Sequence, residues 1–169
     1  MQRTLALARR GLDEGELPIG ALVVIDDTVA AEAYWRGDQE GGVLRHPELV
    51  ALLEADAIVG SRSRLQSCLY TTLEPCLMCM GAAMSLFLGR VVYALDAPLD
   101  GASHVGTEWT PGTGSYRVPD VVGGICRDEA EALLHEYLAT GPVGPVAAWA
   151  ARTGALLGRA DLDAGGQIP

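Results

Sequence analysis

Three side chains that bind soft metal ions stand in two short segments, Pro75-Cys76-Leu77-Met78-Cys79 and His46-Pro47-Glu48. Two cysteines and a histidine supply three ligands to a zinc ion and leave the fourth tetrahedral position open for water, as in a catalytic site. Bound zinc lowers the pKa of water from about 15.7 to near 7, which makes hydroxide available at neutral pH. A carboxylate beside that water can shuttle protons. We therefore predict that His46, Cys76 and Cys79 bind zinc and that Glu48 is the catalytic residue.

Each of these residues also has a simpler interpretation. The two cysteines could be a redox pair or two small buried hydrophobic residues, His46 alone could be structural, and Glu48 could be an acidic residue favoured at a helix start. Because the Pro-Cys-x-x-Cys and His-x-Glu patterns occur together, zinc binding is favoured. The other two cysteines, Cys68 and Cys126, lie in or beside apolar segments and are expected in the core.

Both metal-binding segments are expected to begin helices. Pro47 and Pro75 lack the backbone N–H that a first helical turn leaves unpaired, so each fits a helix start. The apolar pattern that follows predicts helices over 47–58 and 76–88. Because the N-terminal end of a helix carries a partial positive charge, it favours a thiolate there. Two helix starts are therefore expected to meet at one cation.

The remaining pattern predicts an α/β fold. Strands over 68–73 and 90–95 alternate with the two helices, which is typical of parallel strand pairs. The other expected elements are a first helix ended by Gly15, a hairpin over 19–35, a short strand at Val121-Val122, and helices over 127–139 and 146–157. Residues 96–120 are predicted to form a long loop, and loops of that length are usually functional. We expect a single domain over 1–159 and a flexible tail over 160–169.

Composition narrows the possible functions. All 12 basic residues are arginine, and 22 acidic residues give a net charge of -10. Without lysine there is no internal Schiff base, so chemistry of the pyridoxal-phosphate type is excluded. The acidity disfavours a nucleic-acid partner, because phosphate backbones are bound mainly by clustered Lys and Arg. No signal-peptide pattern or membrane-length apolar run occurs, so we expect a cytoplasmic protein without a membrane partner.

The segment Leu73–Ala82, together with His46 and Glu48, resembles the cytidine deaminase-like superfamily of zinc deaminases. Within it, the segment looks like the branch of bacterial tRNA adenosine deaminases, guanine deaminases and fungal cytosine deaminases, and Gly15–Ala21 is similar to their opening strand. The resemblance implies a three-layer α/β/α sandwich with a mixed five-stranded sheet, one zinc ion and a homodimer. It extends from the first helix to near Leu95 and resumes weakly over 121–138.

Two positions depart from that branch. Pro47 stands where the branch commonly has alanine, which leaves His46 and Glu48 in place. Trp35 stands where the branch usually has an asparagine that contacts the substrate. We therefore expect a pocket different from the usual nucleoside or guanine pocket.

Five residues are candidates for substrate binding, because aromatic faces stack on planar heterocycles and carboxylates accept ring N–H groups. They are Trp35, His104, Glu108, Trp109 and Tyr116. Alternatively, they pack on the sheet as ordinary loop residues. The sequence thus predicts a zinc-dependent hydrolytic deaminase that acts on a small aminated nitrogen heterocycle (nucleobase, nucleoside or analogue) and releases ammonia. The alternatives are a tRNA wobble-adenosine deaminase and a catalytically inactive zinc-binding dimerisation module.

Overall fold

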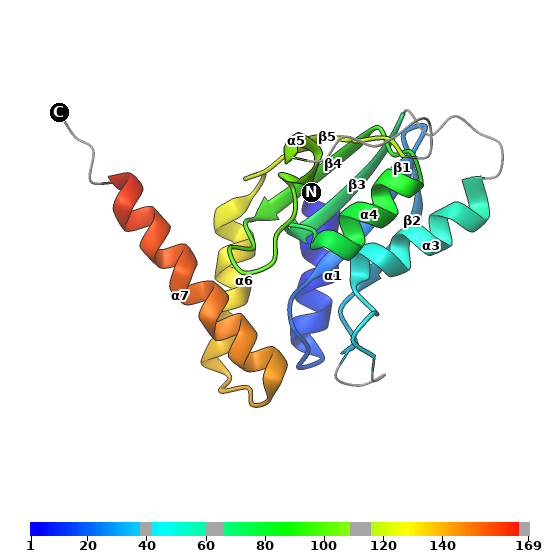
Figure 1. Cartoon of the computed structure of the whole chain (residues 1–169). Coiled ribbons are helices and arrows are strands. Elements are labelled where there is room, and N and C mark those ends of the chain that lie inside the picture. The colour runs from blue at the N-terminus through cyan, green and yellow to red at the C-terminus, as the bar shows by residue number, and fades with distance from the viewer. Residues whose placement is uncertain (38–41, 60–65, 109–115, 166–169) are drawn as a thin grey trace.

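A computed structural model describes residues 1–37, 42–59, 66–108 and 116–165. Its elements are α1 (Gln2–Asp13), β1 (Gly20–Ile25), β2 (Thr28–Tyr34), α3 (Pro47–Val59), β3 (Ser67–Leu73), α4 (Leu77–Ser85), β4 (Arg90–Leu95), α5 (Val105–Glu108), β5 (Asp120–Val122), α6 (Arg127–Ala139) and α7 (Pro145–Gly165). The strands form one five-stranded sheet in the order β2-β1-β3-β4-β5, with helices on both sides (Figure 1).

The sheet is mixed, as predicted. β1 runs antiparallel to both β2 and β3, whereas β3, β4 and β5 run parallel to one another. Asp26 and Asp27 join β1 to β2 with positive φ angles of 50° and 59°, the conformation of the two-residue turns that suit a twisted hairpin. In the parallel part, α4 provides the connection from β3 to β4, so its first turn lies beyond the carboxyl end of β3.

Two hydrophobic cores fill the space between the sheet and its helices. The first joins α3 and α4 to one face of the sheet through residues such as Leu52, Met80 and Leu69. The second joins α1, α6 and α7 around residues such as Leu12 and Leu134. This arrangement confirms the predicted three-layer α/β/α sandwich and places the starts of α3 and α4 in the same layer (Figure 1).

The helix at the C-terminal end is longer than the sequence pattern predicted. We expected a helix over 146–157 and a tail from 160, but α7 continues to Gly165. Ala160, Leu162 and Ala164 have high helix propensity, which favours this extension. Neither α7 nor any other helix of the described ranges is both long and apolar enough to cross a membrane.

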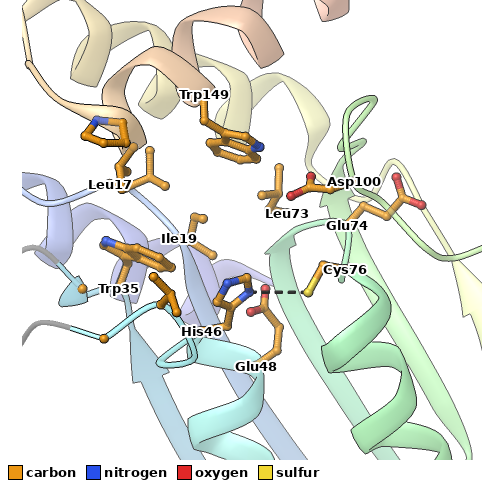
Figure 2. Close-up of a pocket in the computed structure, with 15 residues that line it drawn as sticks. Leu17, Ile19, Trp35, His46, Glu48, Leu73, Glu74, Cys76, Asp100 and Trp149 are labelled. Carbon is orange, nitrogen blue, oxygen red and sulfur yellow. Dashed lines mark hydrogen bonds between the residues drawn. The ribbon is translucent and has the colours of Figure 1, made fainter.

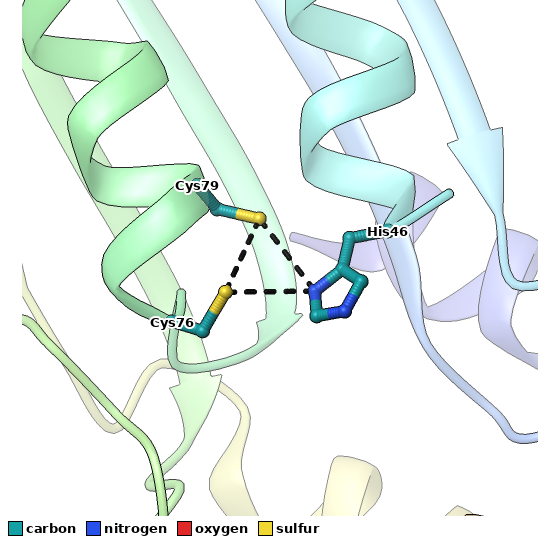
Figure 3. A group of neighbouring side chains, drawn as sticks. All are labelled: His46, Cys76 and Cys79. Atoms are coloured by element: carbon teal, nitrogen blue, oxygen red, sulfur yellow. Dashed lines mark hydrogen bonds between the residues drawn. The ribbon is translucent and has the colours of Figure 1, made fainter. Parts of the chain in front are cut away.

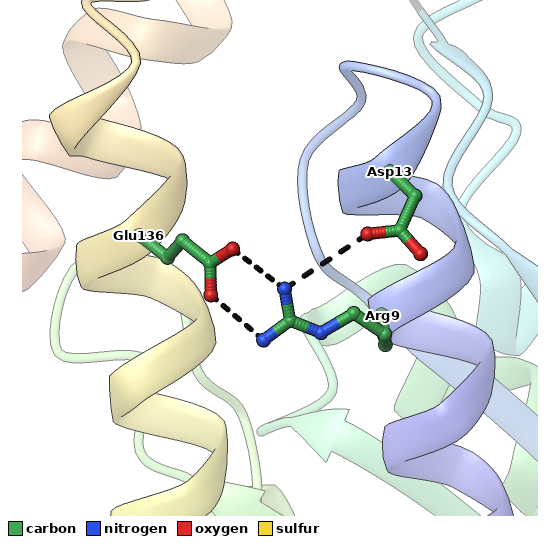
Figure 4. Close-up of polar contacts among 3 residues, drawn as sticks. All are labelled: Arg9, Asp13 and Glu136. Atoms are coloured by element: carbon green, nitrogen blue, oxygen red, sulfur yellow. Dashed lines mark hydrogen bonds and ion pairs between the residues drawn. The ribbon is translucent and has the colours of Figure 1, made fainter.

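A charged contact joins α1 to α6 on the surface. The Arg9 guanidinium donates two hydrogen bonds to the Glu136 carboxylate, each 2.7 Å long, and lies 3.9 Å from Asp13 (Figure 4). The hydrogen bond from Arg9 lowers the pKa of Glu136 below its usual value. Because this bidentate geometry matches the planar guanidinium, it fixes how the two helices face each other.

Candidate active site

His46, Cys76 and Cys79 meet at the starts of two helices (Figure 3). His46 immediately precedes α3, Cys76 is the N-cap residue of α4, and Cys79 lies in the first turn of α4. The Cys76 sulfur is 3.6 Å from Nδ1 of His46 and 3.7 Å from the Cys79 sulfur, and the Cys79 sulfur is 3.7 Å from Nδ1. The three predicted ligands therefore lie together, with their donor atoms in a nearly equilateral triangle.

That triangle has the dimensions of one face of a tetrahedral zinc site. Zn–S bonds of about 2.3 Å and Zn–N bonds of about 2.0 Å place neighbouring ligand atoms about 3.5 to 3.8 Å apart in such a site. The observed separations of 3.6 and 3.7 Å fall in this interval. Both the chemistry of the donor set and its spacing fit zinc, and three protein ligands leave one position for water.

The local electrostatics favour a thiolate at this point. The hydrogen bond between the two sulfurs, with a further contribution from His46, lowers the pKa of Cys76 to about 4. The same bond, together with burial, raises the pKa of Cys79. The contact with Cys76 raises the pKa of His46. Because both cysteines would bind zinc as thiolates, metal binding at this site would release the proton of the Cys79 thiol.

Glu48 lies behind this triangle and is only 3% exposed. Its Oε1 accepts a hydrogen bond of 2.6 Å from the Thr71 hydroxyl, and its Oε2 lies 3.8 Å from the Cys79 sulfur. Burial raises the pKa of Glu48, while the bond from Thr71 acts in the opposite direction. A carboxyl group with a raised pKa beside a metal-bound water is suited to carry a proton.

A cavity of about 500 Å³ opens in front of His46, Glu48 and Cys76 (Figure 2). Its walls are mostly apolar and come from four places in the chain. Leu17 and Ile19 precede β1, Trp35 follows β2, and Leu73 ends β3. The start of α7 contributes Pro145, Val146 and Trp149. The cavity has the size and the character of a small-molecule site, with few polar groups on an apolar lining.

Trp35 lines the cavity beside His46, and its predicted role in substrate binding stays a prediction. Its ring centroid is 5.5 Å from that of His46, in an edge-to-face arrangement, and the side chain is 8% exposed. Gly37 is necessary for this position, since a Cβ there would lie 2.5 Å from the Trp35 ring. The indole N–H is buried and has no hydrogen-bond partner in the described part of the chain.

Glu74, which borders the cavity, has a structural role. Its Oε2 accepts the backbone N–H of Ala97 and its Oε1 accepts that of Ser103, both at 3.0 Å. The N–H of Ala102 also donates to the carbonyl oxygen of Pro75 at 2.9 Å. These bonds hold the segment after β4 against the start of α4, and so bring Asp100 to the edge of the cavity (Figure 2).

The other predicted substrate residues lie apart from this cavity. His104 and Glu108 are exposed and face each other at 3.8 Å, and Tyr116 is 43% exposed. None of these three is among the residues that line the cavity, and Trp109 lies outside the described residues. A role in substrate binding for His104, Glu108, Trp109 and Tyr116 therefore remains a prediction. It requires that the substrate, or a second copy of the chain, extends over residues 96–120.

Sequence reasoning missed two polar residues at the cavity. Asp100 lies in a long predicted loop that contains several other acidic and hydroxyl residues, so nothing in the sequence distinguishes it. Trp149 lies in a predicted helix among apolar residues, a position typical of the core. Both line the cavity in the structure. The only available signal was the tryptophan itself, because a large aromatic residue with a polar N–H near a helix start is common at binding surfaces.

The mixed five-stranded sandwich and the His, Cys, Cys triangle define a zinc deaminase of the cytidine deaminase-like class. Residues 1–95 match the family model of the cytidine and deoxycytidylate deaminase zinc-binding region. The chain belongs to this family, which confirms the predicted superfamily, zinc as the cofactor and an enzyme that hydrolyses C–N bonds.

Several known proteins are similar to this chain. A tRNA-specific adenosine deaminase of Agrobacterium fabrum is 30% identical over 137 residues, which are 81% of this chain and 90% of that protein. A solved tRNA:A34 deaminase superposes with a TM-score of 0.67 at 31% identity and covers 79% of this chain and 96% of its own. A structure solved with 2,6-diaminopurine has a TM-score of 0.67 at 25% identity, over 85% of this chain and 82% of that one.

The match to one longer relative is partial. A tRNA(Ile)-lysidine synthase of Deinococcus radiodurans is 35% identical over 137 residues, but the chain spans only 23% of that protein.

Proposed function

We propose that the protein deaminates a small aminated nitrogen heterocycle, a nucleobase, nucleoside or analogue, by hydrolysis, with release of ammonia. The observation that carries this proposal is the position of Glu48. It is a buried carboxylate whose Oε2 faces the metal-binding triangle at 3.8 Å from Cys79, at the end of a cavity of about 500 Å³.

In this proposal, His46, Cys76 and Cys79 hold the zinc ion and Glu48 moves the protons. Zinc bound there would supply a water molecule whose pKa is about 7. Glu48 takes up one proton at Oε2 and later delivers it to the leaving amino nitrogen, so that an amidine C–NH₂ and water become a C=O and ammonia. Such general acid and base catalysis typically contributes about 10²- to 10⁴-fold in rate.

Thr71 keeps the two oxygens of Glu48 in different roles. The hydroxyl of Thr71 occupies Oε1 at 2.6 Å, which leaves Oε2 for the proton transfers. Burial raises the pKa of Glu48, so the proton can be held long enough to be passed on. The apolar walls strengthen these interactions because they keep bulk water away from the reacting groups.

Three features support a small substrate. The cavity is bounded by Trp149, Val146 and Pro145 of α7 in addition to the sheet side, so a free heterocycle is enclosed on several sides (Figure 2). The chain contains no lysine and carries a net charge of -10, which weakens any attraction to a phosphate backbone. A relative of the same fold has been solved with 2,6-diaminopurine, a small aminated purine.

The second candidate is deamination of the wobble adenosine of a tRNA. It is favoured by the relatives that bear that name, including the one that shares 30% identity with this chain. Incubation with a tRNA anticodon stem-loop at low salt distinguishes the two. Conversion of the stem-loop adenosine to inosine, with no ammonia from free heterocycles, would replace the small-molecule proposal.

The decisive test compares the unmodified protein with Glu48→Gln. Both are loaded with zinc, and ammonia release is followed over a panel of aminated purines, pyrimidines, pterins and triazines, as free bases and as nucleosides. We expect turnover of at least one compound, a loss of about 10²- to 10⁴-fold in the variant, and an equal zinc content in both. Equal activity of the two proteins would exclude the proposed role of Glu48. No turnover across the panel or on tRNA would favour the inactive zinc-binding module.

We also propose a homodimer in the cytoplasm. Leu53 and Ile58 of α3 and Leu77 of α4 are 64%, 56% and 65% exposed, so apolar surface remains on the helical layer that carries the zinc ligands. A second copy of the chain would cover such a surface. Light scattering of the unmodified protein and of Leu77→Glu tests this, and a monomer in both would exclude the dimer.

A further inference from the structure

Most polar groups around the cavity already have a partner or a proposed role. Glu74 accepts two backbone N–H groups, and Glu48 accepts the Thr71 hydroxyl on one oxygen. His46 and Cys76 belong to the metal-binding triangle. A substrate needs other partners for the polar edge of its ring that faces away from the metal.

Asp100 and Trp149 supply an acceptor and a donor at that place. Both line the cavity, and the nitrogen of the Trp149 indole is directed to the side on which Asp100 lies (Figure 2). The Trp149 N–H is buried and makes no hydrogen bond of standard geometry to the residues that the structure describes, although it is near enough to the Asp100 carboxyl group to act on it. A buried donor without a well-formed hydrogen bond is unfavourable, so a ligand in the cavity that accepts from the Trp149 N–H gains affinity.

The surroundings of Asp100 fit a role toward a neutral ligand. Burial raises its pKa, the negative charge of Cys76 acts in the same direction, and the Trp149 N–H acts against them. A carboxylate in this setting gains from a ring N–H or an amino group of a ligand, because that donor replaces lost hydration. Apolar side chains such as Leu73 and Val146 complete the wall around the pair.

We propose that Asp100 and Trp149 determine substrate specificity by reading one edge of the heterocycle, with Asp100 accepting an N–H and Trp149 donating to a ring nitrogen or carbonyl. This inference rests on the proposed function and deepens it. The substrate class is a planar, uncharged heterocycle that carries a donor and an acceptor on neighbouring atoms of the edge opposite the reacting amino group. Both residues lie after the segment 1–95 that matches the family model.

The test uses Asp100→Asn and Trp149→Phe, with Asp128→Asn in the exposed first turn of α6 as the matched control. Each is assayed with adenine, guanine, cytosine, 2,6-diaminopurine and a diaminotriazine, and KM and kcat are determined for the compounds that release ammonia. We expect Asp100→Asn to raise KM about 10- to 100-fold and Trp149→Phe about 3- to 10-fold, with kcat changed less than KM. Zinc content and melting temperature should match those of the control, because neither side chain touches the ligand triangle.

The outcomes distinguish the role of Asp100 and Trp149 from the deaminase activity itself. If the unmodified protein releases ammonia but both variants keep the KM of Asp128→Asn, Asp100 and Trp149 do not read the substrate. If kcat falls while KM is unchanged, they act on the chemistry rather than on recognition, and the inference is likewise overturned. If the unmodified protein deaminates none of the compounds, the small-heterocycle function itself is wrong, and this inference with it.

Discussion

Thr71, in the middle layer of the fold, donates its hydroxyl hydrogen to Oε1 of Glu48 over 2.6 Å, and both side chains are buried. β3 supplies Thr71 and the helix start after His46 supplies Glu48, so a strand of the sheet fixes the orientation of the proposed proton carrier. The site therefore depends on the sheet as well as on the two helices that hold the metal ligands.

Replacement of Thr71 by valine removes this hydrogen bond and keeps the shape of the side chain. We expect kcat to fall about 10- to 100-fold, because a hydrogen bond to a charged group is worth about 1.5 to 3 kcal/mol, while zinc content stays the same. Steady-state kinetics and metal analysis measure both. An unchanged kcat would show that Glu48 is positioned by its own helix alone.

The metal-binding triangle predicts different results for two single cysteine variants. Cys79→Ser replaces a soft ligand at the metal, whereas Cys68→Ser changes a half-buried cysteine outside the triangle. We expect Cys79→Ser to lose at least about 10-fold in zinc affinity and to lose activity, and Cys68→Ser to keep both. Removal of zinc by a chelator should also lower the melting temperature of the unmodified protein, since metal binding stabilises the folded state. Equal zinc affinity in both variants would contradict the assignment.

Gly37→Ala tests the position of Trp35. A Cβ at Gly37 would lie 2.5 Å from Cζ2 of Trp35, so the indole has to move away from its place beside His46. We expect a loss of about 1 to 3 kcal/mol in the free energy of unfolding and a higher KM, both from the displaced ring. Gly81→Ala is the control, because a Cβ there has no atom within 4 Å. If the two variants behave alike, the Trp35 wall is not constrained by Gly37.

Glu74→Gln should loosen the segment that carries Asp100. Glutamine has one carbonyl oxygen for the two N–H groups that the carboxylate of Glu74 accepts, so one of them loses its partner. We expect the free energy of unfolding to fall by about 1.5 to 3 kcal/mol, measured in urea. Glu54→Gln, on the exposed side of α3, serves as control. A variant as stable as the control would exclude this role.

The ion pair between α1 and α6 predicts a pH dependence of stability. Arg9 lowers the pKa of Glu136 in the folded protein, so its contribution is complete above the unfolded pKa of about 4.3 and is lost as the pH falls through the folded value. We expect Glu136→Gln to be slightly less stable than the unmodified protein at pH 7, and the difference to shrink as the pH falls below the unfolded pKa and to vanish below the folded pKa. Melting temperatures across this range measure it. A difference that persists at low pH would point to a packing effect of the substitution.

The fold could be predicted from the sequence where local signals and burial agree. The strand over 90–95 and the helix over 127–139 were predicted at their observed bounds, because apolar periodicity and the flanking Gly and Pro residues act together there. α4 was predicted to extend to Leu88 but ends at Ser85, and Phe87 has a φ of 59°. Leu86 and Leu88 are buried and Phe87 is half-buried, so nothing in this apolar run predicts the turn from the sequence.

The metal triangle was predictable and the substrate wall was not, for a physical reason. Zinc requires particular donor atoms at short spacings, so His46, Cys76 and Cys79 carry their chemistry in their residue types. An apolar cavity wall can be made by any large side chain from any element that reaches it. Asp100 and Trp149 come from a loop and from the last helix, and only the folded chain brings them to the same place.

The division of the cavity lining between the matched segment 1–95 and the later residues has a consequence for engineering. The metal ligands and Glu48 all lie within residues 1–95, which also supply cavity walls such as Trp35. Asp100 and Trp149, which we propose to read the substrate edge, lie after that segment. On this proposal, we expect a chimaera that keeps residues 1–95 and takes the later residues from a relative to change its substrate selectivity and to retain the metal ligands and Glu48. Substitutions after residue 95 can therefore change the proposed selectivity and leave the metal ligands in place.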